Sequence, residues 1–129
     1  MSNTRKRPRF DNPDADSVPS EHVEPREFVS WFRKTFPGVR IAAITNGGRR
    51  SKSEAMRLKA EGVDPGIPDL VVPEWLWWCE MKRQKGGTVS KEQKKWHEYL
   101  KWCGYQVSVC RGCDEAIAEA KRLYKHRQP

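Results

Sequence analysis

The sequence predicts an α/β fold in which a mixed β-sheet is flanked by helices. Three observations lead to this prediction. Short apolar runs alternate with segments whose apolar residues repeat at helical spacing, Gly and Pro stand between most of these segments, and no internal repeat is visible. The 129 residues suit one compact domain, and six tryptophans with four phenylalanines exclude a chain that is disordered throughout.

Residues 1–19 are expected to form a tail, which leaves residues 20–129 as the folded domain. Pro, Asp, Asn, Ser and Arg dominate the tail, so it has almost nothing to bury. Its basic stretch at residues 5–9 has two interpretations, either a solvated segment or an arm used for targeting or for contact with DNA.

A first helix is predicted from Ser20 to about Phe36. Ser20 is a suitable N-cap, and Pro37 followed by Gly38 is a signal for the end of a helix. One face of this helix carries Glu21, Glu24, Phe28, Trp31 and Thr35. The apolar run Val39–Thr45, rich in β-branched residues, is predicted to be a buried strand.

The remaining predicted elements alternate between helix and strand. They are a helix at residues 51–60, strands at 67–72 and 76–82, a helix at 90–103, a strand at 105–110 and a helix at 114–125. Ser90 can cap the middle helix, and Gly104 can end it. The expected apolar stripe of that helix consists of Trp96, Tyr99, Leu100 and Cys103.

The charge balance favours a polyanionic partner. The formal net charge is +8 and the isoelectric point is about 9.5. The longest apolar run, residues 75–79, is far shorter than the roughly 20 residues of a membrane span, and the first residues lack the apolar core of a signal peptide. We therefore expect a cytoplasmic chain that is not secreted, has no membrane partner and binds no nucleotide cofactor.

The cysteines and histidines do not favour a zinc centre. Cys110 and Cys113 have the spacing of half a zinc site, and Cys103 could be a third ligand, but no fourth ligand follows at a usual spacing. Without a secretory signal, all four cysteines are expected to be free thiols. The three histidines also lack the spacing of a catalytic pair.

Asp69, Glu80 and Lys82 form the pattern with the clearest chemistry. If the two central strands form a hairpin with a two-residue loop at residues 74–75, Asp69 stands opposite Glu80, and Lys82 shares the face of Glu80. Two adjacent carboxylates repel unless a divalent cation lies between them. Their oxygens suit Mg²⁺ or Mn²⁺, and the Met81 carbonyl could add a ligand. The alternative is a set of surface charges, but acids embedded in apolar strands need another reason.

Several ordered stretches resemble the VRR-NUC (virus-type replication-repair nuclease) domain of the PD-(D/E)xK nuclease superfamily. The most specific are Gly66–Leu70, Cys79–Arg83 and Gly87–Gln93. Further agreement is found at Ser20–Glu24, Thr45–Arg49, Leu58–Gly62, Gly104–Val107 and Asp114–Ala116. The resemblance extends from about Ser20 to Leu123, nearly everything but the tail.

The resemblance implies Mg²⁺-dependent hydrolysis of DNA, with Asp69, Glu80 and the Met81 carbonyl holding the ion. Lys82 would orient the attacking water, and Gln93 would position Lys82 or the phosphate. The first-helix acid of the family has two candidates here, Glu21, which is favoured, and Glu24. Relatives usually carry Gln where this chain has Pro25, so the sequence departs from the family at this helix start.

Basic residues on loops and outer helix faces are candidates for contacts with the DNA backbone. They are Arg49, Arg50, Lys52, Arg83, Lys85, Lys91, Lys94 and Lys95. Such contacts would make binding salt-dependent and poorly sequence-specific. For each of them the alternative is a solvated surface charge.

Single-domain members of this family resemble phage-encoded enzymes that act as homodimers on branched double-stranded DNA and resolve Holliday junctions. A small chain with one site needs two copies to cut two strands, so a homodimer is expected, in a bacterial cytoplasm if the chain is phage-encoded. The alternatives are a flap or nicking nuclease of the same fold and a DNA-binding module with an inactive site.

The six tryptophans have two interpretations, packing in the core or stacking on bases. Core packing is favoured because most of them fall at strand or helix positions that face the interior. Trp75 or Trp77, on the strand face opposite Glu80, could instead form a seam between two copies.

Overall fold

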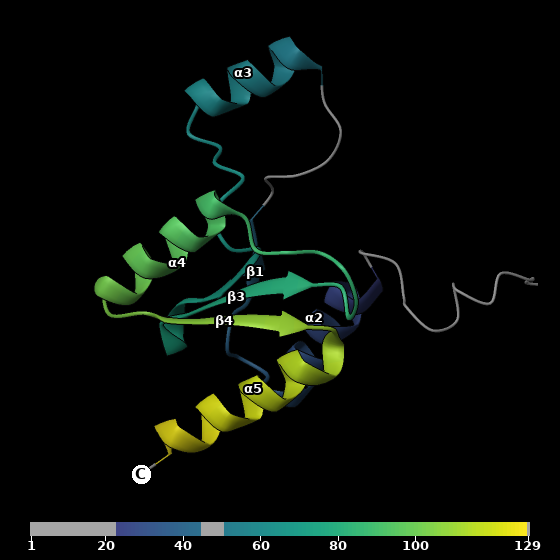
Figure 1. The fold of residues 1–129 in the computed structure, drawn as a ribbon. Helices are drawn as coiled ribbons and strands as arrows, with labels where there is room; N and C mark the ends of the chain where they lie inside the picture. The colour runs from purple at the N-terminus through teal and green to yellow at the C-terminus, as the bar shows by residue number, and fades with distance from the viewer. Residues whose placement is uncertain (1–22, 45–50, 129) are drawn as a thin grey trace, which may run out of the picture.

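The computed structural model describes residues 23–44 and 51–128, and it confirms the predicted fold class (Figure 1). A four-stranded mixed sheet lies between helices. The elements are α2 (Val23–Thr35), β1 (Ala42–Ala43), α3 (Lys52–Ala60), β2 (Leu70–Val72), the 3₁₀ turn η1 (Pro73–Trp75), β3 (Trp77–Lys82), α4 (Lys91–Trp102), β4 (Gln106–Arg111) and α5 (Cys113–Arg127). None of these helices is long and apolar enough to cross a membrane.

The strands are arranged in the order β1-β2-β3-β4. β1 with β2 and β2 with β3 are antiparallel, whereas β3 and β4 are parallel and joined through α4. Leu70 pairs with Cys79, which is the register expected for the hairpin. The predicted two-residue loop is wrong, because Pro73 opens a 3₁₀ turn that buries Trp75 and ends at Leu76, at a φ of 51°.

The alternation of side chains along β3 divides the molecule into two faces. Trp77, Cys79 and Met81 are buried in the core cluster, which also holds Phe28 and Phe32 of α2. The Phe28 and Trp77 rings meet edge to face at 6.1 Å. Figure 1 shows α2 and α5 on one side of the sheet and α4 on the other. Glu80 therefore lies on the face covered by α4.

The proposed tryptophan seam between copies is wrong for this reason. Trp75 and Trp77 are 5% and 0% exposed. Aromatic rings of α2 and α5 surround them, among them Phe32 at 5.2 Å and Tyr124 at 6.0 Å from Trp75. α2 and α5 thus cover the sheet face opposite Glu80 within one chain, so Trp75 and Trp77 are not accessible to a second copy.

The first strand also differs from the prediction. In place of a buried strand over Val39–Thr45, only Ala42 and Ala43 pair, and both are exposed. Both alanines lie at the edge of the sheet and have small side chains. The neighbouring Ile41 is the residue of this segment that is buried in the core. Thr45 and the predicted start of the first helix at Ser20 lie outside the described residues. The end of that helix before Pro37 is confirmed.

The middle helix begins as predicted but is rotated relative to the expected stripe. Ser90 caps α4 in a capping box with Gln93. His97 and Leu100 are buried, whereas Tyr99 and Cys103, expected in the stripe, are exposed. Gln93, His97 and Leu100 follow at helical spacing, so the face toward the sheet begins with a polar residue.

The aromatic core predicts a large loss of stability when Phe28 is truncated. Phe28→Ala removes a fully buried ring that contacts Trp77, and we expect it to lower the free energy of unfolding by about 3–5 kcal/mol. Urea denaturation followed by circular dichroism measures this. Met56→Ala, which truncates a side chain that is 69% exposed, is the control and should change little. Equal effects from both substitutions would contradict this description of the core.

Candidate active site

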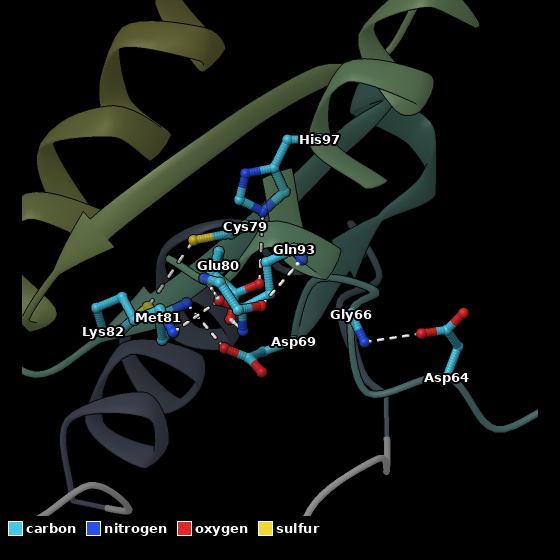
Figure 2. Close-up of polar contacts among 10 residues, drawn as sticks. Asp64, Gly66, Asp69, Cys79, Glu80, Met81, Lys82, Gln93 and His97 are labelled. Carbon is cyan, nitrogen blue, oxygen red and sulfur yellow. Dashed lines mark hydrogen bonds and ion pairs between the residues drawn. The ribbon is translucent and has the colours of Figure 1, made fainter. Parts of the chain in front are cut away.

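The structure brings Asp69, Glu80, Lys82 and Gln93 together at one end of the hairpin (Figure 2). Asp69 directly precedes β2, and Glu80 and Lys82 lie two residues apart on β3, on the face toward α4. Gln93 lies in the first turn of α4. Successive segments of the chain, from the start of β2 to the first turn of α4, thus bring together these four residues, which we call the carboxylate–lysine cluster.

Asp69 is fixed through both its backbone and its side chain. Its carbonyl oxygen accepts a hydrogen bond of 2.8 Å from Ile44 N, and its Oδ2 accepts one of 2.9 Å from Met81 N. β2 begins only at Leu70, later than predicted, in part because Pro68 has no N–H to donate to a strand ladder. The half-buried carboxylate is therefore oriented before any ligand binds.

Glu80 is the most strongly perturbed acid of the cluster. Its side chain is 2% exposed, and burial together with the neighbouring Asp69 raises its pKa to about 8, against the lowering effect of Lys82. Glu80 Oε2 accepts a 3.4 Å hydrogen bond from Gln93 Nε2. Its Oε1 has no hydrogen-bond partner and lies 3.6 Å from Nε2 of the buried His97.

Gln93 connects the lysine to the acid. Its Oε1 accepts hydrogen bonds of 3.0 Å from both Lys82 Nζ and Ser90 N, while its amide nitrogen donates to Glu80. Ser90 Oγ in turn accepts from Gln93 N at 3.1 Å. The capping box that starts α4 therefore also fixes the side-chain amide of Gln93, which holds Lys82. The sequence had left open whether Gln93 would position Lys82 or the phosphate.

The carboxylate–lysine cluster fits a hard divalent cation. Glu80 Oε1 is a buried acceptor without a donor, and two adjacent carboxylates are the oxygens that Mg²⁺ or Mn²⁺ prefers. Among the described residues, no group of three or more His, Cys, Asp or Glu side chains converges to hold a metal. Mg²⁺ sites in proteins commonly use one or two carboxylates, with water and substrate phosphate as further ligands.

The two candidate acids of the first helix have different outcomes. Glu21 lies outside the described residues. Glu24 is buried, but its Oε1 accepts from Cys113 N at 2.8 Å, and both of its oxygens accept from Gln84 Nε2 at 3.1 Å. Its carboxylate thus caps the N-terminus of α5, where Gly112 as N-cap supplies no side chain. The structure does not place Glu24 in the hydrogen-bonded cluster.

The candidate DNA-contacting residues that are described lie on the surface. Lys52, Arg83, Lys85, Lys91, Lys94 and Lys95 are all exposed, whereas Arg49 and Arg50 lie outside the described residues. Sequence reasoning missed Arg111, whose guanidinium donates at 3.0 Å to the carbonyls of Gly86 and Gly87. Arg111 thus ties residues 83–89, which we call the basic loop, to the end of β4. The sequence signal for this contact is a charge at the end of a strand.

His97 was also missed as a neighbour of the cluster. Burial and the nearby Lys101 and Lys82 lower its pKa, so its imidazole is neutral at pH 7. Its position one turn after Gln93 was the available signal, because residues four apart on a helix share a face.

A carboxylate pair and a lysine thus lie together on the central hairpin of a mixed sheet flanked by helices. The family model of the VRR-NUC domain matches residues 6–114, and the chain therefore belongs to the VRR-NUC family, which is a nuclease family. A solved structure described as a VRR_NUC domain protein superposes with a TM-score of 0.65 at 23% identity, covering 81% of this chain and 88% of the other. No curated protein sequence matches the chain.

Cation binding at the cluster should be visible as a change in thermal stability. Mg²⁺ at about ten times its Kd should add about 1.4 kcal/mol, or roughly 4–8 °C in Tm for a domain of this size. Glu80→Gln should raise the metal-free Tm at pH 7, because burial beside Asp69 forces the Glu80 carboxyl to take up a proton on folding and the amide needs none, and it should abolish the rise with Mg²⁺. Differential scanning calorimetry checks both effects. A full Mg²⁺ response in Glu80→Gln would contradict the assignment.

The capping role of Glu24 predicts a structural phenotype. Glu24→Ala leaves Cys113 N–H without its acceptor, and we expect it to lower the free energy of unfolding by about 1–3 kcal/mol. Glu24→Gln keeps an acceptor oxygen and should lose less. The Mg²⁺-dependent rise in Tm should persist in Glu24→Gln, and its loss there would instead make Glu24 the first-helix metal ligand.

Proposed function

We propose that this protein is a Mg²⁺-dependent endonuclease that hydrolyses DNA phosphodiester bonds, with Mn²⁺ able to replace Mg²⁺. One observation carries the proposal: buried Glu80 lies beside Asp69, with Lys82 held on the same face by Gln93. Membership of a nuclease family supports the same conclusion. Asp69, Glu80, the Met81 carbonyl and Glu21 are the proposed metal ligands.

The proposed roles follow from the contacts of each side chain. A bound divalent cation would supply Lewis-acid polarisation of the phosphate and a water of lowered pKa. Lys82 has three N–H donors and directs one to Gln93, so the others can orient the attacking water or stabilise charge developing on the phosphate. Gln93 fixes the ammonium position, and Met81 N–H fixes the Asp69 carboxylate.

The substrate proposed is branched double-stranded DNA, cut as a Holliday junction by a homodimer. A net charge of +8 and exposed lysines around the basic loop and α4 favour a polyanion. The described residues of a chain hold one carboxylate–lysine cluster, so we infer that paired cuts in two strands use two copies. Arg49 and Arg50, with the exposed basic residues given above, are the proposed backbone contacts.

The test is cleavage of a labelled four-way junction beside a flap, a nicked duplex and a plain duplex, in Mg²⁺, Mn²⁺ or EDTA. Symmetrical metal-dependent cuts in the junction are expected. Cuts confined to the flap or nick would keep the nuclease and replace its substrate. Tight binding without cuts in either metal would make the chain a DNA-binding module.

Lys82→Ala should lower the cleavage rate by at least about 100-fold, because it removes the donor positioned by Gln93. Its Kd for the junction, measured in EDTA, should change little, since one charge among many phosphate contacts is lost. Lys125→Ala, an exposed lysine of α5, is the matched control. Equal rates for the two variants would contradict the role of Lys82.

A further inference from the structure

Three aromatic side chains on α4 form a row that leads out of the core into solvent. Trp96 is half-buried, Tyr99 is 55% exposed and Trp102 is 83% exposed. We call them the aromatic row. The favoured interpretation of the tryptophans as core residues is wrong for Trp102. An indole ring left in water loses the free energy that burial of its apolar surface would contribute. The high exposure of Trp102 therefore points to a partner that covers the ring.

The row is ordered by contacts within the chain. The Trp96 and Tyr99 rings meet edge to face at 5.9 Å, and the Tyr99 and Trp102 rings stack at 6.1 Å with 29° between their planes. The Asp64 carboxylate accepts from Gly66 N at 2.9 Å (Figure 2), and this bond together with the neighbouring Trp96 side chain lowers the pKa of Asp64. A Cβ on Gly66 would come within 2.8 Å of the Trp96 ring, so this end of the row is tightly packed.

The aromatic row begins at Trp96, three residues after Gln93, which is the α4 residue of the carboxylate–lysine cluster. Gln93, Trp96, Tyr99 and Trp102 follow one another in steps of three residues, each of which turns about 60° around the helix. The row therefore winds from the face toward the sheet to the face toward solvent. Trp102 lies about 14 Å along the helix axis from Gln93, a length that about four stacked nucleotides span.

The charge along the helix selects the partner. α4 carries four lysines against two glutamates and is therefore positive overall. The exposed Lys95 lies one turn before Tyr99, whereas the exposed Glu98 lies one turn before Trp102. A flat aromatic face on a helix of net positive charge matches a base and its phosphate. A second copy fits less well, because a two-fold contact would place this positive surface against itself.

We propose that the aromatic row is a stacking site for unpaired nucleotides of a branched DNA, an inference that rests on the proposed nuclease function. Bases freed at a branch point would stack on Trp102 and Tyr99 while a phosphodiester about four nucleotides further along the strand enters the carboxylate–lysine cluster. The site reads single-strandedness and not sequence, since every base has a face on which an aromatic ring can stack.

The experiment measures binding of the full chain in EDTA, where no strand is cut, to three fluorescent duplexes. One is blunt, one carries a short single-stranded thymidine tail, and one carries a tail of equal length without bases. Wild-type protein should bind the thymidine tail about tenfold more tightly than the abasic tail, which has the same charge. Trp102→Ala should erase this difference, and Trp102→Phe should retain most of it.

Val109→Ala, at another exposed apolar position, is the control and should keep the full preference. Equal affinities of wild-type protein for both tails would overturn the inference, as would dissociation of a dimer into monomers by Trp102→Ala in light scattering. Junction cleavage by the same preparation separates the two proposals. Cleavage without a thymidine preference removes the stacking site alone, whereas a thymidine preference without cleavage supports the stacking site and removes the nuclease.

Discussion

The burial of Glu80 beside Asp69 is the constraint on which the rest of this structure depends. Two carboxylates with so little water between them are unfavourable as anions, which is why the pKa of Glu80 rises to about 8. The fold holds them there through the hairpin register and through the Met81 N–H bound to Asp69. This arrangement carries an electrostatic cost that a bound divalent cation would remove, which supports the proposed metal-dependent chemistry.

The helices around the sheet differ in what they contribute to the core and to the candidate site. α2 and α5 supply the aromatic and aliphatic side chains that bury Trp77, and Glu24 joins them by capping α5. α4 buries little apolar surface and places Gln93 over Glu80 and Lys82 instead. The hydrophobic core and the carboxylate–lysine cluster thus lie on opposite faces of β3, because successive side chains of a strand alternate.

Sequence reasoning succeeded where a residue's role is set by local geometry. The spacing of Glu80 and Lys82, the cap at Ser90 and the pairing of Leu70 with Cys79 all follow from strand and helix periods. It failed at the edge strand and at the stripe of α4. There the burial of a side chain depends on what a distant element covers, which helical spacing alone does not specify.

The sequence by itself determined the family, the mixed α/β fold and the carboxylate–lysine pattern. Each of these depends on short motifs and on the spacing of residues within single helices and strands. Only the tertiary structure decided that Glu24 caps α5, that His97 lies against Glu80 and that Trp102 remains in solvent. Each of these outcomes depends on tertiary contacts between different helices and strands, or on the absence of such contacts. Such contacts are determined by how the helices pack against the sheet.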